Sequence, residues 1–256
     1  MGKGTIHKYQ IDSEHNEFIG LIIPGGWEEF FRFIGEPYSG PLFPTNDHRN
    51  PMEVLIPKLM AASEKFDMIP VREKAHFEVQ PWDGSETKLP GVCENGGYFL
   101  RENAGEKFVV GGTVVRPMAT RKETNGRFSI YSLEASSIHK GKGLSKPVKF
   151  ASTHHAIFTV EGIMKVLIDG NEALAKAGET TFVPAGSSFT VEAESKYSRA
   201  YVFANGGGIG EILTSVGEKY ELSAVPGEAA AWDQSKVKNL ETELSFSHLS
   251  ETVHLA

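Results

Sequence analysis

The sequence predicts an all-β protein, an antiparallel sandwich or barrel, with a short helical region ahead of it. Two observations support this fold class. From residue 97 onward, short runs rich in Val, Ile, Thr, Phe and Tyr follow one another along the chain. Turns that contain Gly separate several of these runs, among them Asp169-Gly170-Asn171 and Pro184-Ala185-Gly186. Short strands spaced by such turns are typical of a double antiparallel sheet.

The composition is that of a globular protein. The 256 residues carry 26 Lys and Arg against 33 Asp and Glu, and the net charge of −7 argues against a surface that binds nucleic acid or an anionic membrane. No run approaches the roughly 18 apolar residues that span a bilayer. The single cysteine, Cys93, cannot form an intramolecular disulfide. We therefore expect a soluble, cytoplasmic protein with neither nucleic-acid nor membrane partners.

The first 35 residues predict two strands and a short helix. Residues 5–11 alternate polar and large side chains, and residues 18–23 are an apolar run, so both predict strands. After the Pro24-Gly25-Gly26 turn, aromatic residues and Ile at 27, 30, 31 and 34 share one face of a helix. Gly35 ends this helix.

A second helix and a long connection follow. Asn50-Pro51 has the pattern of a helix N-cap with Pro in the first turn, so residues 51–65 are predicted to be helical. Pro57 should kink or restart this helix, because proline has no backbone N–H. Residues 66–95 contain three prolines and no periodicity, and they predict an irregular connection.

The second half of the chain predicts strands and then two short helices. The predicted strands are Tyr98–Leu100, Lys107–Val115, Arg127–Glu134, His155–Val160, Ile163–Ile168, Thr180–Val183, Ser188–Glu192 and Arg199–Phe203. The predicted helices lie near Gly208–Ser215 and, with weaker character, at Gln234–Leu240.

Three residues in this region carry a resemblance to a known family. Gly178, Pro184 and Gly186, spaced Gly-x5-Pro-x-Gly ahead of an apolar strand, resemble the second signature of the cupin family. Glu161-Gly162 lies where the first cupin signature ends in a Gly turn. The resemblance implies that the predicted double sheet is a cupin barrel.

The N-terminal region indicates which group of cupins the sequence resembles. Residues 5–11 and 20–31 resemble the exit from the first barrel of the fungal quercetin 2,3-dioxygenase-like bicupins. The resemblance therefore implies a remnant of a first barrel followed by a complete second one. The implied domains are residues 1–35 for the remnant, 36–96 for a helical and irregular linker, 97–225 for the complete cupin barrel and 226–256 for a tail.

The resemblance also indicates where a metal would bind. In the dioxygenases the first barrel holds its metal through three His and one Glu, and only His7 of this sequence matches that set. The corresponding positions of the second barrel are Val148, Phe150, His155 and Phe189. Because a catalytic divalent metal needs about three protein ligands, we expect no metal cofactor. The alternative is iron, copper or another divalent metal held in a different arrangement.

These observations lead to a functional hypothesis. We expect a metal-independent cupin that binds a small aromatic or polyketide-like molecule, as an enzyme of secondary metabolism that catalyses dehydration, isomerisation or cyclisation. His155 would be the acid or base, because burial keeps its imidazole neutral; alternatively, it is only a hydrogen-bonded core residue. The other catalytic candidates are Tyr131, Tyr201 and Arg116. The predicted substrate-binding wall is Val148, Phe150, Ile157 and Phe189.

Two alternative functions stay open, and the sequence also predicts a homodimer partner. The protein would otherwise be a metal-dependent quercetin 2,3-dioxygenase-like oxygenase that cleaves a ring, or a non-enzymatic cupin that binds a small molecule. The N-terminal strand pair has an unpaired edge and an apolar face, which need a cover. We expect it to pack on the barrel or to be exchanged in a homodimer. The contact residues would be Phe18, Leu21, Ile23, Trp27 and Phe31.

Overall fold

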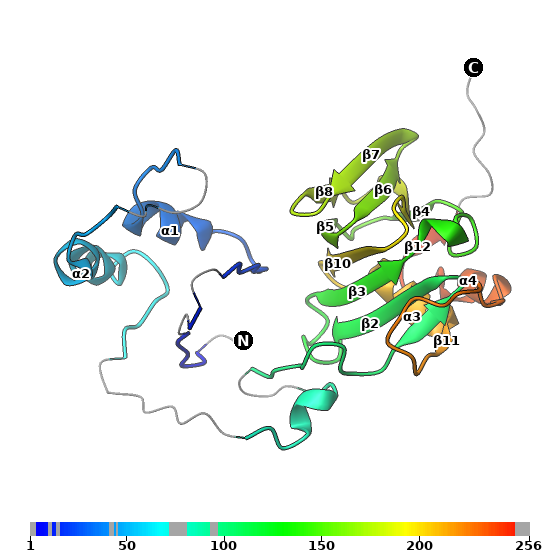
Figure 1. The fold of residues 1–256 in the computed structure, drawn as a ribbon, viewed down its shortest axis with the longest axis horizontal. Helices are drawn as coiled ribbons and strands as arrows, with labels where there is room; N and C mark the ends of the chain where they lie inside the picture. The colour runs from blue at the N-terminus through cyan, green and yellow to red at the C-terminus, as the bar shows by residue number, and fades with distance from the viewer. Residues whose placement is uncertain are drawn as a thin grey trace. The chain divides into compact units, whose positions relative to one another are not determined.

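The computed structural model describes residues 4–9, 12–13, 16–40, 44, 46–71, 81–92 and 97–248. Contacts between backbone positions divide the chain into two units, Ile6–Gln80 and Pro81–Ala256, the latter grouped with Met1–Thr5. Figure 1 traces the chain through both units. Cys93 and part of the predicted connection lie outside the described residues, and the predicted domain boundaries and cytoplasmic location stay predictions.

The smaller unit contains the two predicted helices, α1 (Glu28–Ile34) and α2 (Pro51–Ala62). At the start of α2, the side-chain oxygen of Asn50 accepts a hydrogen bond from the Met52 N–H at 3.0 Å, as an N-cap does. Helix α2 continues through Pro57. Trp27 stacks on Phe30, with ring centres 4.5 Å apart. Both predicted helices of this unit are confirmed, although α2 ends three residues before the predicted residue 65 and does not restart at Pro57.

The predicted strands of the smaller unit are wrong. None of the described residues within 5–11 and 18–23 forms a strand. The physical reason is that two strands alone bury too little surface to be stable without a further strand or a helix packed on them. Phe18 and Phe31 have exposed side chains, 84% and 53% of the maximum. The homodimer stays a prediction, because the structure contains one chain.

The larger unit is built from two antiparallel sheets (Figure 1). One has seven strands in the order β11-β1-β2-β3-β10-β5-β8, and the other has five in the order β12-β4-β9-β6-β7. The strands are β1 (Phe108–Val110), β2 (Thr113–Ala119), β3 (Ser129–Ala135), β4 (Val148–Phe150), β5 (His155–Glu161), β6 (Ile163–Ile168), β7 (Asn171–Lys176), β8 (Thr180–Val183), β9 (Ser188–Ala193), β10 (Ser198–Ala204), β11 (Glu218–Lys219) and β12 (Phe246–His248). Two helices accompany them, α3 (Ile209–Val216) and α4 (Ser235–Leu240), with 3₁₀ turns at Ser85–Thr87 and Ser137–His139.

Most strand predictions for this unit are confirmed, and two are wrong. Residues 98–100 form no strand; the Tyr98 hydroxyl instead donates a hydrogen bond to the Met118 carbonyl at 2.7 Å. Residues 107–115 form two strands, because the chain turns at Gly111, where φ is +60°. A Cβ atom at Gly111 would lie 2.2 Å from the Lys142 carbonyl oxygen, so this turn requires glycine. Strands β4, β7, β11 and β12 were not predicted.

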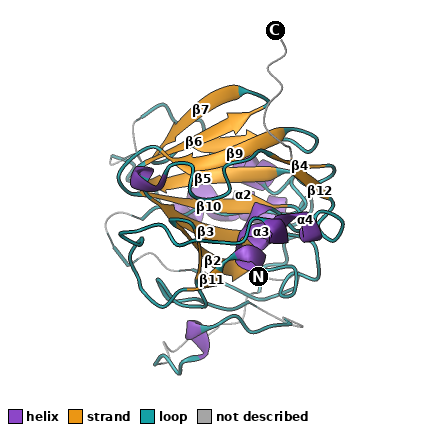
Figure 2. Ribbon diagram, turned by 90° about the vertical axis from the view of Figure 1, so that its right-hand side faces the viewer, coloured by secondary structure: helices purple, strands orange, loops and turns teal. Residues whose placement is uncertain are grey.

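One hydrophobic core lies within the larger unit, and helix α3 is part of it. Ile209, Ile212, Leu213 and Val216 of α3 are buried in the same cluster as the inward-facing strand residues. Burying each such side chain contributes about 1.5–3 kcal/mol. Helix α3 contacts β1, β2 and β3, and Figure 2 shows it next to β2 and β3. No helix among the described residues is long and apolar enough to cross a membrane.

Candidate functional site

His155 is the first residue of β5, and its side chain faces the core. Side chains alternate along a strand, so His155, Ile157 and Thr159 point inward while His154 points outward. The His155 side chain is 1% exposed. Its ring centre lies 4.8 Å from that of Phe150 and 4.9 Å from that of Phe189. The imidazole is therefore enclosed by aromatic rings.

The imidazole of His155 caps helix α3. Its Nε2 accepts a hydrogen bond from the Ile209 N–H at 3.2 Å, one of the backbone donors that a helix leaves unpaired at its start. Gly208, the N-cap residue, has no side chain that could accept this bond. Because Nε2 is the acceptor, the ring proton is on Nδ1, which is buried without a hydrogen-bond partner among the described residues. His155 thus connects β5 to α3.

The environment of His155 keeps its imidazole neutral. Burial lowers its pKa to about 3, and the nearby charge of His154 acts in the same direction. The lone pair of Nε2 is consequently available to accept a hydrogen bond at neutral pH. As long as α3 stays in place, this lone pair is used by the Ile209 N–H.

The buried histidine predicts a pH dependence of stability. In the unfolded chain the His155 pKa returns to about 6.5, so the unfolded state binds one more proton than the folded state between this value and about 3. The free energy of unfolding should fall by about 1.4 kcal/mol for each unit of pH below about 6. His155→Gln keeps a side-chain oxygen that can accept the hydrogen bond but has no group that titrates in this range. Its free energy of unfolding, measured by urea unfolding at a series of pH values, should therefore fall less steeply as the pH is lowered. Equal slopes for both proteins would contradict the assignment.

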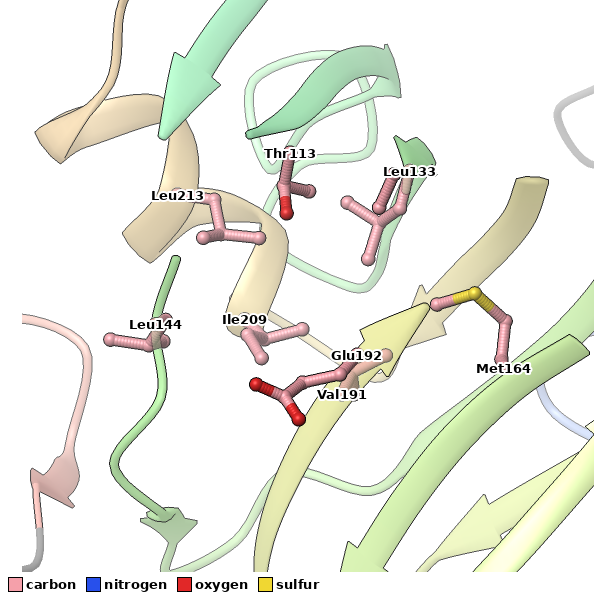
Figure 3. Close-up of a pocket in the computed structure, with 9 residues that line it drawn as sticks. Thr113, Leu133, Leu144, Met164, Val191, Glu192, Ile209 and Leu213 are labelled. Atoms are coloured by element: carbon pink, nitrogen blue, oxygen red, sulfur yellow. The ribbon is translucent and has the colours of Figure 1, made fainter. Parts of the chain in front are cut away.

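The cavity beside α3 is small (Figure 3). Its volume is about 20 Å³, which is enough for about one water molecule. Ile209 and Leu213 of α3 form one side of it, and Leu133 and Met164 lie across from them. The remaining lining residues are Thr113, Ala135, Leu144, Val191 and Glu192. Helix α3 therefore fills much of the space that a ligand would need.

The structure separates the four predicted catalytic residues into two pairs. Tyr131 faces the core like His155, and a Cβ atom at Gly210 of α3 would lie 2.1 Å from its ring. Burial raises the Tyr131 pKa above its ordinary value, and the charge of Glu211 adds to this effect. Arg116 and Tyr201 lie on the opposite face of the sheet, because their strand neighbours Val115 and Val202 belong to the core.

The predicted substrate-binding wall is part of the core. Val148, Phe150, Ile157 and Phe189 are each at most 1% exposed. None of them lines the cavity beside α3. Their role in binding stays a prediction, and it requires a rearrangement that opens the core.

The residues within the described barrel do not fit a divalent cation. Val148 and Phe189 lie opposite each other in register, and Phe150 follows two residues after Val148. Phe150 and Phe189 flank His155, whose Nε2 already accepts a hydrogen bond from the Ile209 N–H. In the part of the chain that the structure describes, no group of three or more His, Cys, Asp and Glu side chains could hold a metal.

Sequence reasoning missed the part that α3 plays in the site. The helix was predicted, but its insertion in the barrel core was not. Its apolar residues recur at positions i, i+3, i+4 and i+7, a pattern that indicates a buried helix face. An ion pair also holds it, since Arg121 Nε lies 2.8 Å from Glu211 Oε1. The Arg121–Glu211 pair joins residues 90 positions apart, and no sequence pattern indicates it.

The larger unit has the double-sheet fold of a cupin, as predicted. Solved structures that are similar to the chain include two cupins. The cupin domain of Schizosaccharomyces pombe Cnp3 shares 16% identity and covers 37% of this chain and 65% of that one, with a TM-score of 0.31. An RmlC-like cupin from Shewanella frigidimarina shares 15% identity and covers 45% of this chain and 96% of that one, with a TM-score of 0.36.

Two curated proteins are similar in sequence, and both are quercetin 2,3-dioxygenases. The one from Bacillus subtilis is 26% identical over 134 residues, which are 52% of this chain and 38% of that protein. The one from Aspergillus japonicus is 20% identical over 244 residues, 88% of this chain and 69% of that protein. No family model matches the sequence. The chain is thus similar to quercetin dioxygenase-like cupins at low identity, and the match spans well under half of the Bacillus protein.

Proposed function

We propose that the unit Pro81–Ala256 is a metal-independent cupin that binds a small aromatic or polyketide-like molecule and acts on it in secondary metabolism. The observation that carries this proposal is the neutral imidazole of His155 between the rings of Phe150 and Phe189. Aromatic rings suit an aromatic ligand, and a neutral imidazole has a lone pair that can accept a proton. The reaction class is dehydration, isomerisation or cyclisation, each of which needs proton transfer and no oxidant.

Ligand binding in the barrel requires that α3 withdraw. A cavity of about 20 Å³ cannot hold an aromatic ring. Helix α3 is preceded by Gly206-Gly207-Gly208 and followed by Gly217, and glycine gives these flanks the backbone freedom that a hinge uses. Withdrawal would break the bond from the Ile209 N–H to Nε2 of His155. The same movement would then open the core and release the lone pair of the base.

Quercetin, added to chelator-treated protein, tests this function. We expect binding, measured by fluorescence titration, without oxygen uptake. Phe189→Leu should weaken binding severalfold, because the ring at the wall is lost. The matched control is Phe182→Leu on β8, whose side chain is exposed and outside the core. It should bind as the unchanged protein does.

Two results would replace the proposal. Oxygen uptake that chelation abolishes and a divalent ion restores would favour the metal-dependent dioxygenase. If quercetin or related polyketides bind and are recovered unchanged by both the original protein and His155→Gln, the protein is a binding cupin without catalytic activity.

A further inference from the structure

A second group of polar residues lies on the outer face of the seven-stranded sheet, away from His155. Arg116 on β2, Ser132 on β3 and Tyr201 on β10 lie opposite one another in register, on strands that are adjacent in Figure 1. Arg199 precedes Tyr201 by two residues and shares its face. The Arg199 Nη2–H donates to the Tyr201 hydroxyl at 3.0 Å. We call Arg116, Ser132, Arg199 and Tyr201 the arginine cluster.

Three buried donors of the arginine cluster have no acceptor. Nε of Arg116, Nε of Arg199 and Oγ of Ser132 are buried and make no hydrogen bond with any described residue. Arg116 is 4% exposed and Ser132 is 1% exposed. A buried donor without an acceptor costs about 1–3 kcal/mol, so three of them on neighbouring strands point to an acceptor from outside the described chain. One Nη1–H of Arg116 donates a hydrogen bond to the Ala104 carbonyl at 3.1 Å.

The nearby carboxylates do not satisfy these donors. Glu102 Oε1 lies 3.6 Å from Nη1 of Arg199, and the Glu102 side chain is 76% exposed. Glu134 lies opposite Arg199 in register, where it accepts a hydrogen bond from the Tyr197 hydroxyl at 2.9 Å. Burial lowers the pKa of the Arg116 guanidinium, and the positive charge of Arg199 acts in the same direction. An anion between the two guanidinium groups would relieve this repulsion and desolvation.

The same face continues as an apolar surface. Phe158 on β5 lies opposite Tyr201, and Phe203 lies opposite Ile130. All three apolar side chains are half-buried and lie outside the core of the barrel. A ligand that reaches the guanidinium groups with a charged end therefore meets aromatic side chains with its other end.

We propose that the arginine cluster binds the carboxylate of a small aromatic acid, with Phe158 and Phe203 in contact with its ring. A guanidinium Nε–H and a hydroxyl suit the planar oxygens of a carboxylate, and charge-assisted bonds of this kind are the strongest in proteins. This site is independent of the barrel interior and of the function proposed for it.

Calorimetric titration with benzoate tests the site, with the neutral analogue benzamide as the matched ligand control. We expect benzoate to bind, and to bind at least about tenfold more tightly than benzamide. Arg199→Gln and Ser132→Ala should each weaken benzoate binding about tenfold. Arg199→Gln is preferred to a change at Arg116, because Arg199 is the less buried of the two arginines, and thermal melting checks that both variants fold. Arg127→Gln, at an exposed arginine in the loop between β2 and β3, should leave binding unchanged.

Several results would overturn the proposal. The proposal is wrong if benzoate does not bind or if benzoate and benzamide bind equally tightly. It is also wrong if Arg199→Gln and Ser132→Ala fold and bind benzoate as tightly as the unchanged protein does. Inorganic phosphate that binds as tightly as benzoate would show a general anion site and would reject the aromatic acid. Quercetin binding in the barrel is measured separately with Phe189→Leu, so either proposal can fail without the other.

Discussion

Replacing His155 by alanine is expected to lower the free energy of unfolding by about 3–5 kcal/mol. Two losses add in this variant. The Ile209 N–H loses the acceptor that caps α3, and a cavity opens between Phe150 and Phe189. Urea unfolding measures the sum. Hydrogen exchange of the Ile209 amide isolates the first loss, and this exchange should become faster relative to amides of β6.

His154→Ala is the matched control, since it removes the same ring from the adjacent residue. His154 is exposed, its Nδ1 accepts a hydrogen bond from the Ala185 N–H at 3.1 Å, and its ring stacks on Phe182. At an exposed site this hydrogen bond contributes about 1 kcal/mol or less. If the two alanine variants lost equal stability, His155 would have no special part in holding α3.

The second large effect is expected for Gly162→Ala in the turn between β5 and β6. Gly162 has φ of +72°, and a Cβ atom there would lie 2.2 Å from the Tyr197 carbonyl oxygen and 3.0 Å from the Ser198 Cα atom. These contacts are with backbone, which cannot rotate away as a side chain can. We expect a loss of at least about 3 kcal/mol, from strain and overpacking together, with a lower melting temperature in circular dichroism.

Gly170→Ala separates the two causes. Gly170 lies in the turn between β6 and β7, has φ of +84°, and has no atom within 4 Å of a built Cβ. An alanine at this position would therefore have the backbone strain without the clash. Gly170→Ala should lower the free energy of unfolding by about 1 kcal/mol. Equal melting temperatures for the two variants would show that the strands around Gly162 can separate without cost.

The cupin resemblance and most of the barrel strands could be predicted from local sequence. Strands β6 and β8 have the predicted bounds, Ile163–Ile168 and Thr180–Val183, because short β-branched and apolar runs between Gly-containing turns have few other stable conformations. Strand β7, at Asn171–Lys176, was missed because an exposed edge strand need not be apolar. Strand β12 was missed because its three residues are strand only through pairing with β4.

The candidate site could be predicted only in part. The cupin resemblance indicated that His155 lies at a core position, and strand alternation, a local property, then turns the adjacent His154 outward. The sequence did not indicate that Arg116 and Tyr201 face away from His155, because this depends on the register of β2, β3 and β10 and on the irregularity at Pro117. Register is a property of paired strands, and one strand alone does not contain it.

The sequence by itself determined the fold class of this protein, its two N-terminal helices and the residue types at the positions that the cupin resemblance aligns with metal ligands. These follow from the period of apolar residues, from capping patterns and from residue identity, which are local. Only the tertiary structure decided that α3 fills the barrel, that His155 caps this helix, and that Arg116 and Arg199 share the opposite face of the sheet. Such contacts join residues far apart in the chain, so their energies depend on packing that no local pattern encodes.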